Sequence, residues 1–270
     1  MVLKLRDLSI LESWAKLATL PEGKLLINTV NAHSFNTAQK DRLFAEVLNT
    51  DVHPERCRRV LIPDGASIVG ACRWLRAKSR PTERIAGWDL FEYEMGSLSK
   101  LVKIGEKLVR SENAQNYSVD PKKPKVMFMG SSNKVLAKIV EKAAEVYPNL
   151  EVVTYSPPYK PEFSDEDNRA IIDAINTADP DLLWIGMTAP KQEKWTYSHW
   201  DKLNIHCHVG TIGAVFDFFA GTYKRAPQWW QDHSMEWLYR LIKEPKRMWR
   251  RYVLGNPLFI WNVLKEKFLG

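Results

Sequence analysis

The sequence predicts an α/β fold in which a parallel β-sheet carries helices on both faces. Short apolar segments typical of buried strands recur along the chain, amphipathic segments typical of helices separate them, and polar, glycine or proline residues mark the transitions. Strands that alternate with helices favour a parallel sheet, because each crossover helix returns the chain to the same end of the sheet. With 270 residues, 45% of them apolar, the chain can bury the core that such a fold needs.

In the N-terminal half, two strand–helix units are predicted. Residues 24–33 (KLLINTVNAH) read as a buried strand, and residues 35–49 (FNTAQKDRLFAEVLN) as a helix capped by Asn36 or Thr37. Residues 57–78 repeat the pattern as a strand, a Pro-Asp-Gly turn and a helix. The first β-α units of the sheet therefore precede residue 80.

The C-terminal half continues the alternation. Residues 121–148 predict a strand and the clearest amphipathic helix of the chain, and residues 150–159 a strand that two prolines end. Residues 165–195 predict a helix, a turn, a strand and a loop, and residues 204–221 a further strand and loop. The prolines at 121 and 124 are candidates for a boundary between two halves.

The positive charge is concentrated at the C-terminus. Residues 224–270 hold ten Lys or Arg and four Asp or Glu, which is +6 of the total net charge of +7, and five of the eleven tryptophans. A basic segment rich in Trp suits a surface where phosphates meet hydrocarbon. It also suits nucleic acid, in which case oligonucleotide binding should depend strongly on salt, and a solvated helix face is the third interpretation.

The few cysteines and the lack of long uncharged apolar runs indicate the compartment and the relation to a membrane. Three cysteines are too few and too scattered for a disulfide framework or a C-x-x-C metal site, which favours a reducing cytoplasm. The first twenty residues are too charged for a signal peptide, and no uncharged apolar run approaches the ~20 residues that span a bilayer. If the protein meets a membrane, we expect it to lie on the surface.

Polar residues follow the predicted strands, at the end of a parallel sheet where ligands gather. Asp64 is placed as a general base, although an Asp-Gly turn is the competing interpretation. Gly130 and Ser131 precede a helix and suit an anion or a tight turn, and Gln192 suits a hydrogen bond to a ligand or a capping role. Asn31 adds a further polar group at the same end.

One acid, Asp217, lies inside the apolar run GAVFDFFAG. A buried carboxylate is costly unless it is paired or hydrogen-bonded, so this side chain needs a partner. A nucleoside offers an imide N–H and ribose hydroxyls. The alternatives are that Asp217 caps a helix or pairs with Arg225.

Several of these segments together resemble the WecG/TagA/CpsF family of bacterial glycosyltransferases. The resemblance rests on PKQE, FDFxAG, KRAP, EWxYRL, EPxR and RRY, and upstream on NTVNAHSFN, VLIPDGASIV and RIAGWDLF, in the family's order. It covers residues 24 to 262. It implies a Rossmann-like catalytic domain over residues 1–223 and a basic, Trp-rich helical appendage over residues 224–270 that associates with the membrane.

The resemblance also implies a reaction. Such enzymes transfer a sugar (N-acetylmannosamine, N-acetylmannosaminuronic acid, glucose or similar) from a UDP-sugar to an undecaprenyl-diphosphate-linked sugar, with inversion and without a bound metal or other cofactor. The products serve teichoic acid, capsule, exopolysaccharide or common antigen synthesis. We expect a protein of the cytoplasm, peripheral on the inner face of the cell membrane, able to self-associate and not binding nucleic acid. A non-catalytic scaffold of a polysaccharide assembly complex is the alternative.

Residue roles follow from matched positions. Asp64 matches the general base, and Thr29 and Asn31 match residues near the acceptor sugar and the base. On the donor side the matches are Arg84 for the nucleotide diphosphate, Gln192 for the donor and Asp217 for the nucleoside, beside the turn at Gly130 and Ser131. Arg240, Arg247 and Arg250 match appendage arginines expected to hold the lipid diphosphate, and Pro245 is expected to open a new helix there.

Three departures from the family pattern lie on the donor side. Ser131 stands where a second glycine is usual, Met-Thr-Ala-Pro precedes KQE instead of a glycine-rich variant, and Thr211 and Ile212 separate two glycines. These changes leave Asp64 untouched. They make the donor sugar the least certain part of the expected reaction.

Overall fold

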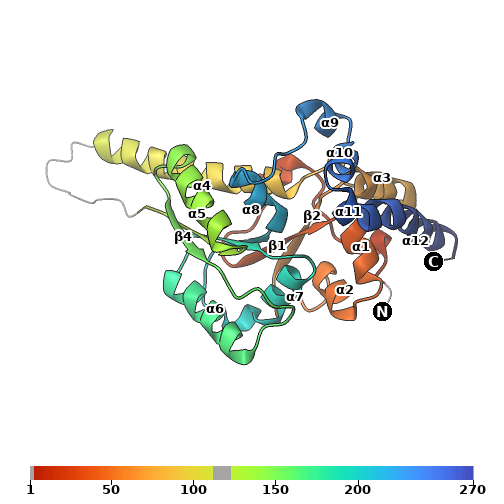
Figure 1. Ribbon diagram of the computed structural model, residues 1–270, viewed down its shortest axis with the longest axis horizontal. Coiled ribbons are helices and arrows are strands. Elements are labelled where there is room, and N and C mark those ends of the chain that lie inside the picture. Colours follow the sequence, from red (N-terminus) through yellow and green to blue (C-terminus); the bar gives the residue numbers. More distant parts are fainter. Residues whose placement is uncertain (1–2, 112–122, 270) are drawn as a thin grey trace.

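The computed structural model describes residues 3–111 and 123–269 (Figure 1). Six strands form one parallel sheet in the order β2-β1-β6-β5-β3-β4. Their bounds are β1 Leu25–Val30, β2 Arg59–Pro63, β3 Lys125–Gly130, β4 Glu151–Tyr155, β5 Leu182–Gly186 and β6 His208–Thr211. The predicted α/β fold with a parallel sheet is confirmed.

Helices cover both faces of this sheet (Figure 1). The helices up to β6 are α1 Ala32–Ala38, α2 Arg42–Leu48, α3 Ala66–Leu75, α4 Gly87–Ser111, α5 Asn133–Val146, α6 Asp165–Ala178 and α7 Lys191–Ser198. After β6 come α8 Gly213–Phe219, α9 Gln228–Asp232, α10 Glu236–Lys243, α11 Pro245–Trp249, a π-helical turn over Arg250–Leu254, and α12 Gly255–Leu269. Short 3-10 helices lie at Leu5–Asp7, Trp14–Thr19 and Trp200–Lys202.

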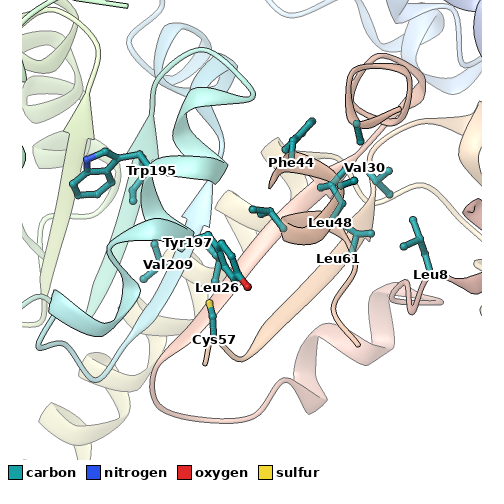
Figure 2. Close-up of a cluster of buried hydrophobic side chains, with 14 of the residues drawn as sticks. Leu8, Leu26, Val30, Phe44, Leu48, Cys57, Leu61, Trp195, Tyr197 and Val209 are labelled. Carbon is teal, nitrogen blue, oxygen red and sulfur yellow. The ribbon is translucent and has the colours of Figure 1, made fainter. Parts of the chain in front are cut away.

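Two hydrophobic cores, one on each face, arise from the two-residue period of the strands. In β1, Leu26 and Val30 join the core under α1, α2 and α7 (Figure 2), whereas Leu25 and Ile27 join the core under α4, α5 and α8. All four side chains are fully buried. Because both faces are covered, the strands read in the sequence as continuous apolar runs.

The segment after β1 corrects one prediction. A single helix over residues 35–49 with a cap at Asn36 or Thr37 is wrong, because two helices form there. Asn31 caps α1: its side chain accepts from the Ser34 N–H, and the Ser34 hydroxyl in turn accepts from the Asn31 N–H. Asp41 caps α2. The reciprocal capping box at Asn31 satisfies free N–H groups that a cap at Asn36 or Thr37 would leave at the helix start.

Two segments expected to be loops are helices. Residues 191–198 form α7 and residues 213–219 form α8, which buries Val215, Phe216 and Phe219 against α4, α5 and β5. Helix α4 is not predicted from the sequence. Of the two prolines proposed as a boundary, Pro121 lies outside the described residues, and the strands before and after Pro124 belong to one sheet.

The C-terminal helices pack beside α1 and α3 at one end of the molecule (Figure 1). The Asn36 amide donates to the Gly255 carbonyl at 2.7 Å and accepts from Asn262 at 3.0 Å. The buried carboxylate of Glu266 accepts from the N–H groups of Leu5 (2.8 Å) and Arg6 (2.7 Å). Both chain termini are therefore tied together.

Pro245 opens α11 at its first position, as predicted. Among the described residues no helix is both long and apolar enough to cross a bilayer. The division into a catalytic domain over 1–223 and an appendage over 224–270 stays a prediction.

Candidate functional site

A cavity of about 1890 Å³ lies at the carboxyl ends of the strands, between the sheet and the C-terminal helices. All six strands deliver residues to it: Asn31 after β1, Asp64 after β2, Ser131 after β3, Ser156 after β4, Met187 after β5 and Ile212 after β6. Because the strands are parallel, residues far apart in the sequence meet at this one end. The expected gathering of polar groups there is present.

Asp64 lines this cavity and is held there by the last residue of β1 and by Asn31, which follows it. Its N–H donates to the Val30 carbonyl at 2.8 Å, which extends the β1–β2 ladder by one residue. The Asn31 side-chain amide donates to Asp64 Oδ2 at 3.3 Å. Thr29, the second-last residue of β1, also lines the cavity. The capping of α1 by Asn31 therefore fixes the amide that contacts Asp64.

Burial raises the pKa of Asp64 above its ordinary value. The guanidinium groups of Arg240 and Arg84 and the Asn31 hydrogen bond oppose this rise, whereas the carboxylate of Glu236 adds to it. A carboxylate with a raised pKa accepts a proton more readily than an ordinary aspartate. The environment of Asp64 is thus suited to proton abstraction from a bound hydroxyl.

An ion-pair bridge forms part of the cavity lining. Glu236, the first residue of α10, pairs with Arg84 Nη1 at 3.3 Å and with Arg240 Nη2 at 3.1 Å. Arg84 is placed by the next residue, because the Ile85 N–H donates to the Pro63 carbonyl beside Asp64 at 2.9 Å. All three charged residues line the cavity. The bridge brings a core arginine and an appendage arginine to the same wall.

On the donor side, the turn after β3 is tightly packed. Gly130 has φ +120°, and a side chain there would collide with the Gly186 backbone. Ser131 adopts φ +58°, a conformation that favours glycine, and its N–H donates to the Gly186 carbonyl at 2.9 Å. Ser131 lines the cavity, whereas Gly130 is not among its lining residues. Ser131 therefore adopts the left-handed backbone conformation that glycine adopts most easily, at the position where the sequence departs from the usual glycine.

Gln192 and Glu193 form a buried pair in the first turn of α7. Gln192 Oε1 accepts from the Met187 N–H at 3.0 Å, and its Nε2 donates to Glu193 Oε1 at 2.9 Å. Gln192 therefore braces the loop after β5 instead of extending freely into the cavity. Burial raises the pKa of Glu193 to about 7, and its Oε2 is buried without a hydrogen-bond partner.

Asp217 lies within α8 and lines the cavity. Its Oδ1 accepts from the Thr222 hydroxyl at 3.1 Å. The alternative pairing with Arg225 does not occur, because Arg225 pairs with Asp89 at 3.6 Å and lies over the Trp88 ring at 5.7 Å. Asp217 is thus oriented by Thr222, with its second carboxylate oxygen Oδ2 left for another donor.

The appendage arginines divide into two groups. Arg240 and Arg247 line the cavity. Arg250 is exposed, does not line the cavity, and places its guanidinium 5.6 Å from the Trp249 ring centre. The next residue, Arg251, lines the cavity instead and, together with burial, lowers the pKa of His33 to about 4, so that this histidine is neutral at pH 7.

Sequence reasoning missed Glu236 and Arg251 as site residues. Both lie in motifs that carried the resemblance, Glu236 in EWxYRL and Arg251 in RRY. Their place in these motifs was the signal that could have identified them. Within the described ranges no cluster of three or more His, Cys, Asp or Glu is arranged to hold a metal ion.

Comparison with known proteins identifies the family. Residues 106–270 match the model of the glycosyl transferase WecG/TagA/CpsF family. The chain is 30% identical over 242 residues to the N-acetylglucosaminyldiphosphoundecaprenol N-acetyl-beta-D-mannosaminyltransferase of Bacillus subtilis strain 168, covering 90% of this chain and 80% of that protein.

Two more relatives carry the same name. The protein of Bacillus spizizenii strain W23 is 31% identical over 91% of this chain and 80% of its own length. That of Staphylococcus aureus strain MW2 is 25% identical over 91% of this chain and 82% of its own length. With the family model over residues 106–270 and relatives of 30% and 31% identity over nine-tenths of its length, the chain belongs to the WecG/TagA/CpsF family of glycosyl transferases.

Proposed function

We propose that the protein transfers a sugar from a UDP-sugar to an undecaprenyl-diphosphate-linked sugar, with inversion, in the synthesis of a cell-surface polysaccharide such as teichoic acid. The observation that carries this proposal is Asp64, a carboxyl with a raised pKa, in a cavity shared with Arg84 and Arg240. The relatives' names add the acceptor class, an N-acetylglucosaminyl diphosphate of undecaprenol, and a β-linked N-acetylmannosaminyl group as the sugar transferred.

Asp64 acts as the general base in this proposal. It takes the proton of the acceptor hydroxyl as that oxygen forms a bond to the anomeric carbon, and the bond from that carbon to the UDP oxygen breaks. One base suffices for such a single displacement. Asn31 orients Asp64 through its 3.3 Å hydrogen bond, and Thr29 lies beside them to contact the acceptor sugar.

Arginines offset the charge that develops on the departing diphosphate. Arg84 supplies a fixed guanidinium, which forms strong, often bidentate hydrogen bonds to phosphate oxygens. The free oxygen of Asp217 accepts from the nucleoside. Ser131, whose N–H is already donated to the Gly186 carbonyl, lines the donor side of the cavity next to the start of α5. Gln192 acts indirectly, because its amide oxygen already accepts from Met187 in the loop that borders the donor and its amide nitrogen already donates to Glu193.

The lipid end of the acceptor lies under the C-terminal helices. Arg240 and Arg247 line the cavity on that side, with Arg250 on the adjacent surface. Outward-facing apolar side chains continue over the same helices, with Trp261 at 63% and Leu254 at 57% exposure. We infer peripheral attachment to the inner face of the cytoplasmic membrane through this surface, with UDP-sugar and lipid acceptor as partners, self-association, and no role for nucleic acid.

The proposal is tested by transfer to a short-chain prenyl-diphosphate-linked N-acetylglucosamine. A panel of UDP-N-acetylmannosamine, UDP-N-acetylmannosaminuronic acid, UDP-N-acetylglucosamine and UDP-glucose, read by product mass, identifies the donor. At least one donor should yield product. A protein that binds UDP yet transfers from no donor would favour the scaffold alternative.

The Asp64→Asn variant should lose at least about 100-fold in turnover, because it lacks the base, and should keep UDP binding nearly unchanged. Asp173→Asn is the matched control, since Asp173 is exposed on α6 and outside the cavity. Full activity of Asp64→Asn would refute the assigned role.

A further inference from the structure

Glu236 holds together two arginines that belong to different parts of the fold. Its Oε2 lies 3.3 Å from Arg84 Nη1, in the segment before α4, and its Oε1 lies 3.1 Å from Arg240 Nη2, in α10. The three side chains are largely shielded from water, with Glu236 at 14%, Arg84 at 23% and Arg240 at 24% exposure. Only a carboxylate separates the two guanidinium groups.

The two arginines have supports that do not depend on Glu236. The Ile85 N–H bonded to Pro63 fixes the backbone next to Arg84. Arg240 lies over the Phe218 ring at 4.8 Å, which fixes its guanidinium on α8. Two positioned guanidinium groups that converge on one carboxylate present a donor array that also fits the oxygens of a diphosphate. Glu236 takes the position that such a group would occupy.

The charges of Arg84, Arg240, Asp64 and Glu236 balance one another when no ligand is bound. Arg84 and Arg240 face Asp64 and Glu236, two formal positive charges against two negative ones. A diphosphate added beside these four groups would find both arginines already paired with Glu236. If it takes the place of the Glu236 carboxylate, it receives both arginines, and one negative charge moves away from Asp64.

We propose that Arg84 and Arg240 form a single diphosphate site that Glu236 occupies in the ligand-free protein and leaves when a diphosphate ester binds. The inference rests on the proposed function for the presence of such a ligand. It assigns Glu236 the role of an internal competitor and positioning residue. The apparent affinity for the diphosphate is then proportional to the fraction of molecules in which Glu236 has left the site.

Isothermal titration of the Glu236→Gln variant tests this. Loss of the carboxylate should tighten UDP binding about tenfold relative to the native protein, because two partly shielded ion pairs no longer compete. Uridine, which lacks phosphates, should bind both proteins equally. Glu236→Ala removes the same carboxylate and should tighten UDP binding as well, with thermal melting used to verify that each variant is folded. The control is Glu166→Gln, which removes an exposed ion pair with Arg169 (3.1 Å) on α6.

Weaker ligand binding after loss of the Glu236 carboxylate overturns the inference. If Glu236 serves only to hold the arginines in place, both variants should bind UDP and geranyl diphosphate more weakly, and unchanged affinity for both ligands contradicts the site as well. A parallel titration with geranyl diphosphate separates the two sources of the ligand, because tightening for UDP alone assigns the site to the nucleotide and tightening for geranyl diphosphate alone assigns it to the lipid.

Failure of the inference differs from failure of the proposed function. A native protein that binds neither UDP nor geranyl diphosphate contradicts both. A native protein that binds them, while neither Glu236 variant binds more tightly, contradicts the shared site alone.

Discussion

Two carboxyls in the cavity wall, Asp64 and Glu193, have pKa values raised by burial, yet their surroundings differ. Arg84 and Arg240 face Asp64, and Asn31 donates to it. Glu193 receives one hydrogen bond from Gln192 and keeps Oε2 without a partner. The first is therefore equipped to function as an anion, whereas the second is costly to ionise.

Replacing Glu193 by Gln should stabilise the protein at alkaline pH. Burial raises the pKa of Glu193 from 4.5 to about 7. Below pH 4.5 the Glu193 carboxyl is neutral in both the folded and the unfolded chain, so its burial does not lower the free energy of unfolding. As pH rises towards 7 the unfolded chain ionises first, so the penalty grows to the order of 3 kcal/mol and then stays constant. The gain in free energy of unfolding should therefore be largest above pH 7 and vanish below about pH 4.

Urea unfolding between pH 4 and pH 8 measures this difference. The variant keeps an amide oxygen that accepts from Gln192, so the packing of the pair is retained. Glu162→Gln, at an exposed position before α6, is the control. Parallel pH profiles for Glu193→Gln and the native protein would contradict the burial of an ionisable carboxyl at this position.

At the scale of elements, α12 is held against α1 through a few buried polar contacts. Asn36, 6% exposed, donates to Gly255 and accepts from Asn262. Phe259 packs edge-on against Phe35 with ring centres 5.8 Å apart. Helix α12 therefore belongs to the core cluster under α1 as much as to the C-terminal segment.

The Asn36→Ala variant should lose about 1–3 kcal/mol of unfolding free energy, because it leaves the Gly255 carbonyl and the Asn262 amide without their partner. Hydrogen exchange over residues 255–269 should accelerate. Asn176→Ala is the matched control, since Asn176 also makes two hydrogen bonds but in a more exposed setting on α6. Equal losses for the two variants would show that Asn36 has no special role in holding α12.

The sequence predicted those elements whose signals are local. Apolar runs with polar residues at their ends marked all six strands, and the spacing in residues 133–146 marked α5. The single helix over 35–49 failed because two competing caps, Asn31 and Asp41, are both legitimate helix starts. Helix α8 was missed because the short run GAVFDFF carries no clear period in a sequence that is buried on most sides.

The candidate site was predictable where it sits on strand ends and not where distant segments dock. Asp64, Asn31 and Ser131 follow strands, so their place at one end of a parallel sheet follows from the fold class. Arg84 and Glu236 are 152 positions apart, and only the packing of α10 over the cavity brings them together. The residues around Arg84 and Glu236 in the sequence do not indicate that the two side chains meet.

For the molecule as a whole, the basic and aromatic C-terminal helices close one side of the cavity and present an apolar outer surface. Deleting them is not a clean test of membrane attachment, because Phe259, Val263 and Glu266 are buried against the rest of the chain. Substitutions on the outer surface leave that packing intact. They are therefore the better test of whether this surface meets lipid.

Trp261→Glu and Leu254→Glu together should reduce sedimentation with vesicles of anionic phospholipid at least several-fold, because charged groups replace two exposed apolar side chains at the expected contact. Leu101→Glu introduces the same kind of charge at a 65% exposed position on α4 and should leave sedimentation unchanged. Vesicle binding by the double variant at the native level would place the membrane contact elsewhere.

The most direct measurement of the central claim, a diphosphate-binding cavity between the sheet and the C-terminal helices, is a crystal structure of the protein with UDP. The account predicts the diphosphate between Arg84 and Arg240, with Glu236 displaced and the uracil next to Asp217. Nucleotide bound outside this cavity, or away from both arginines while Glu236 still bridges them, would contradict it.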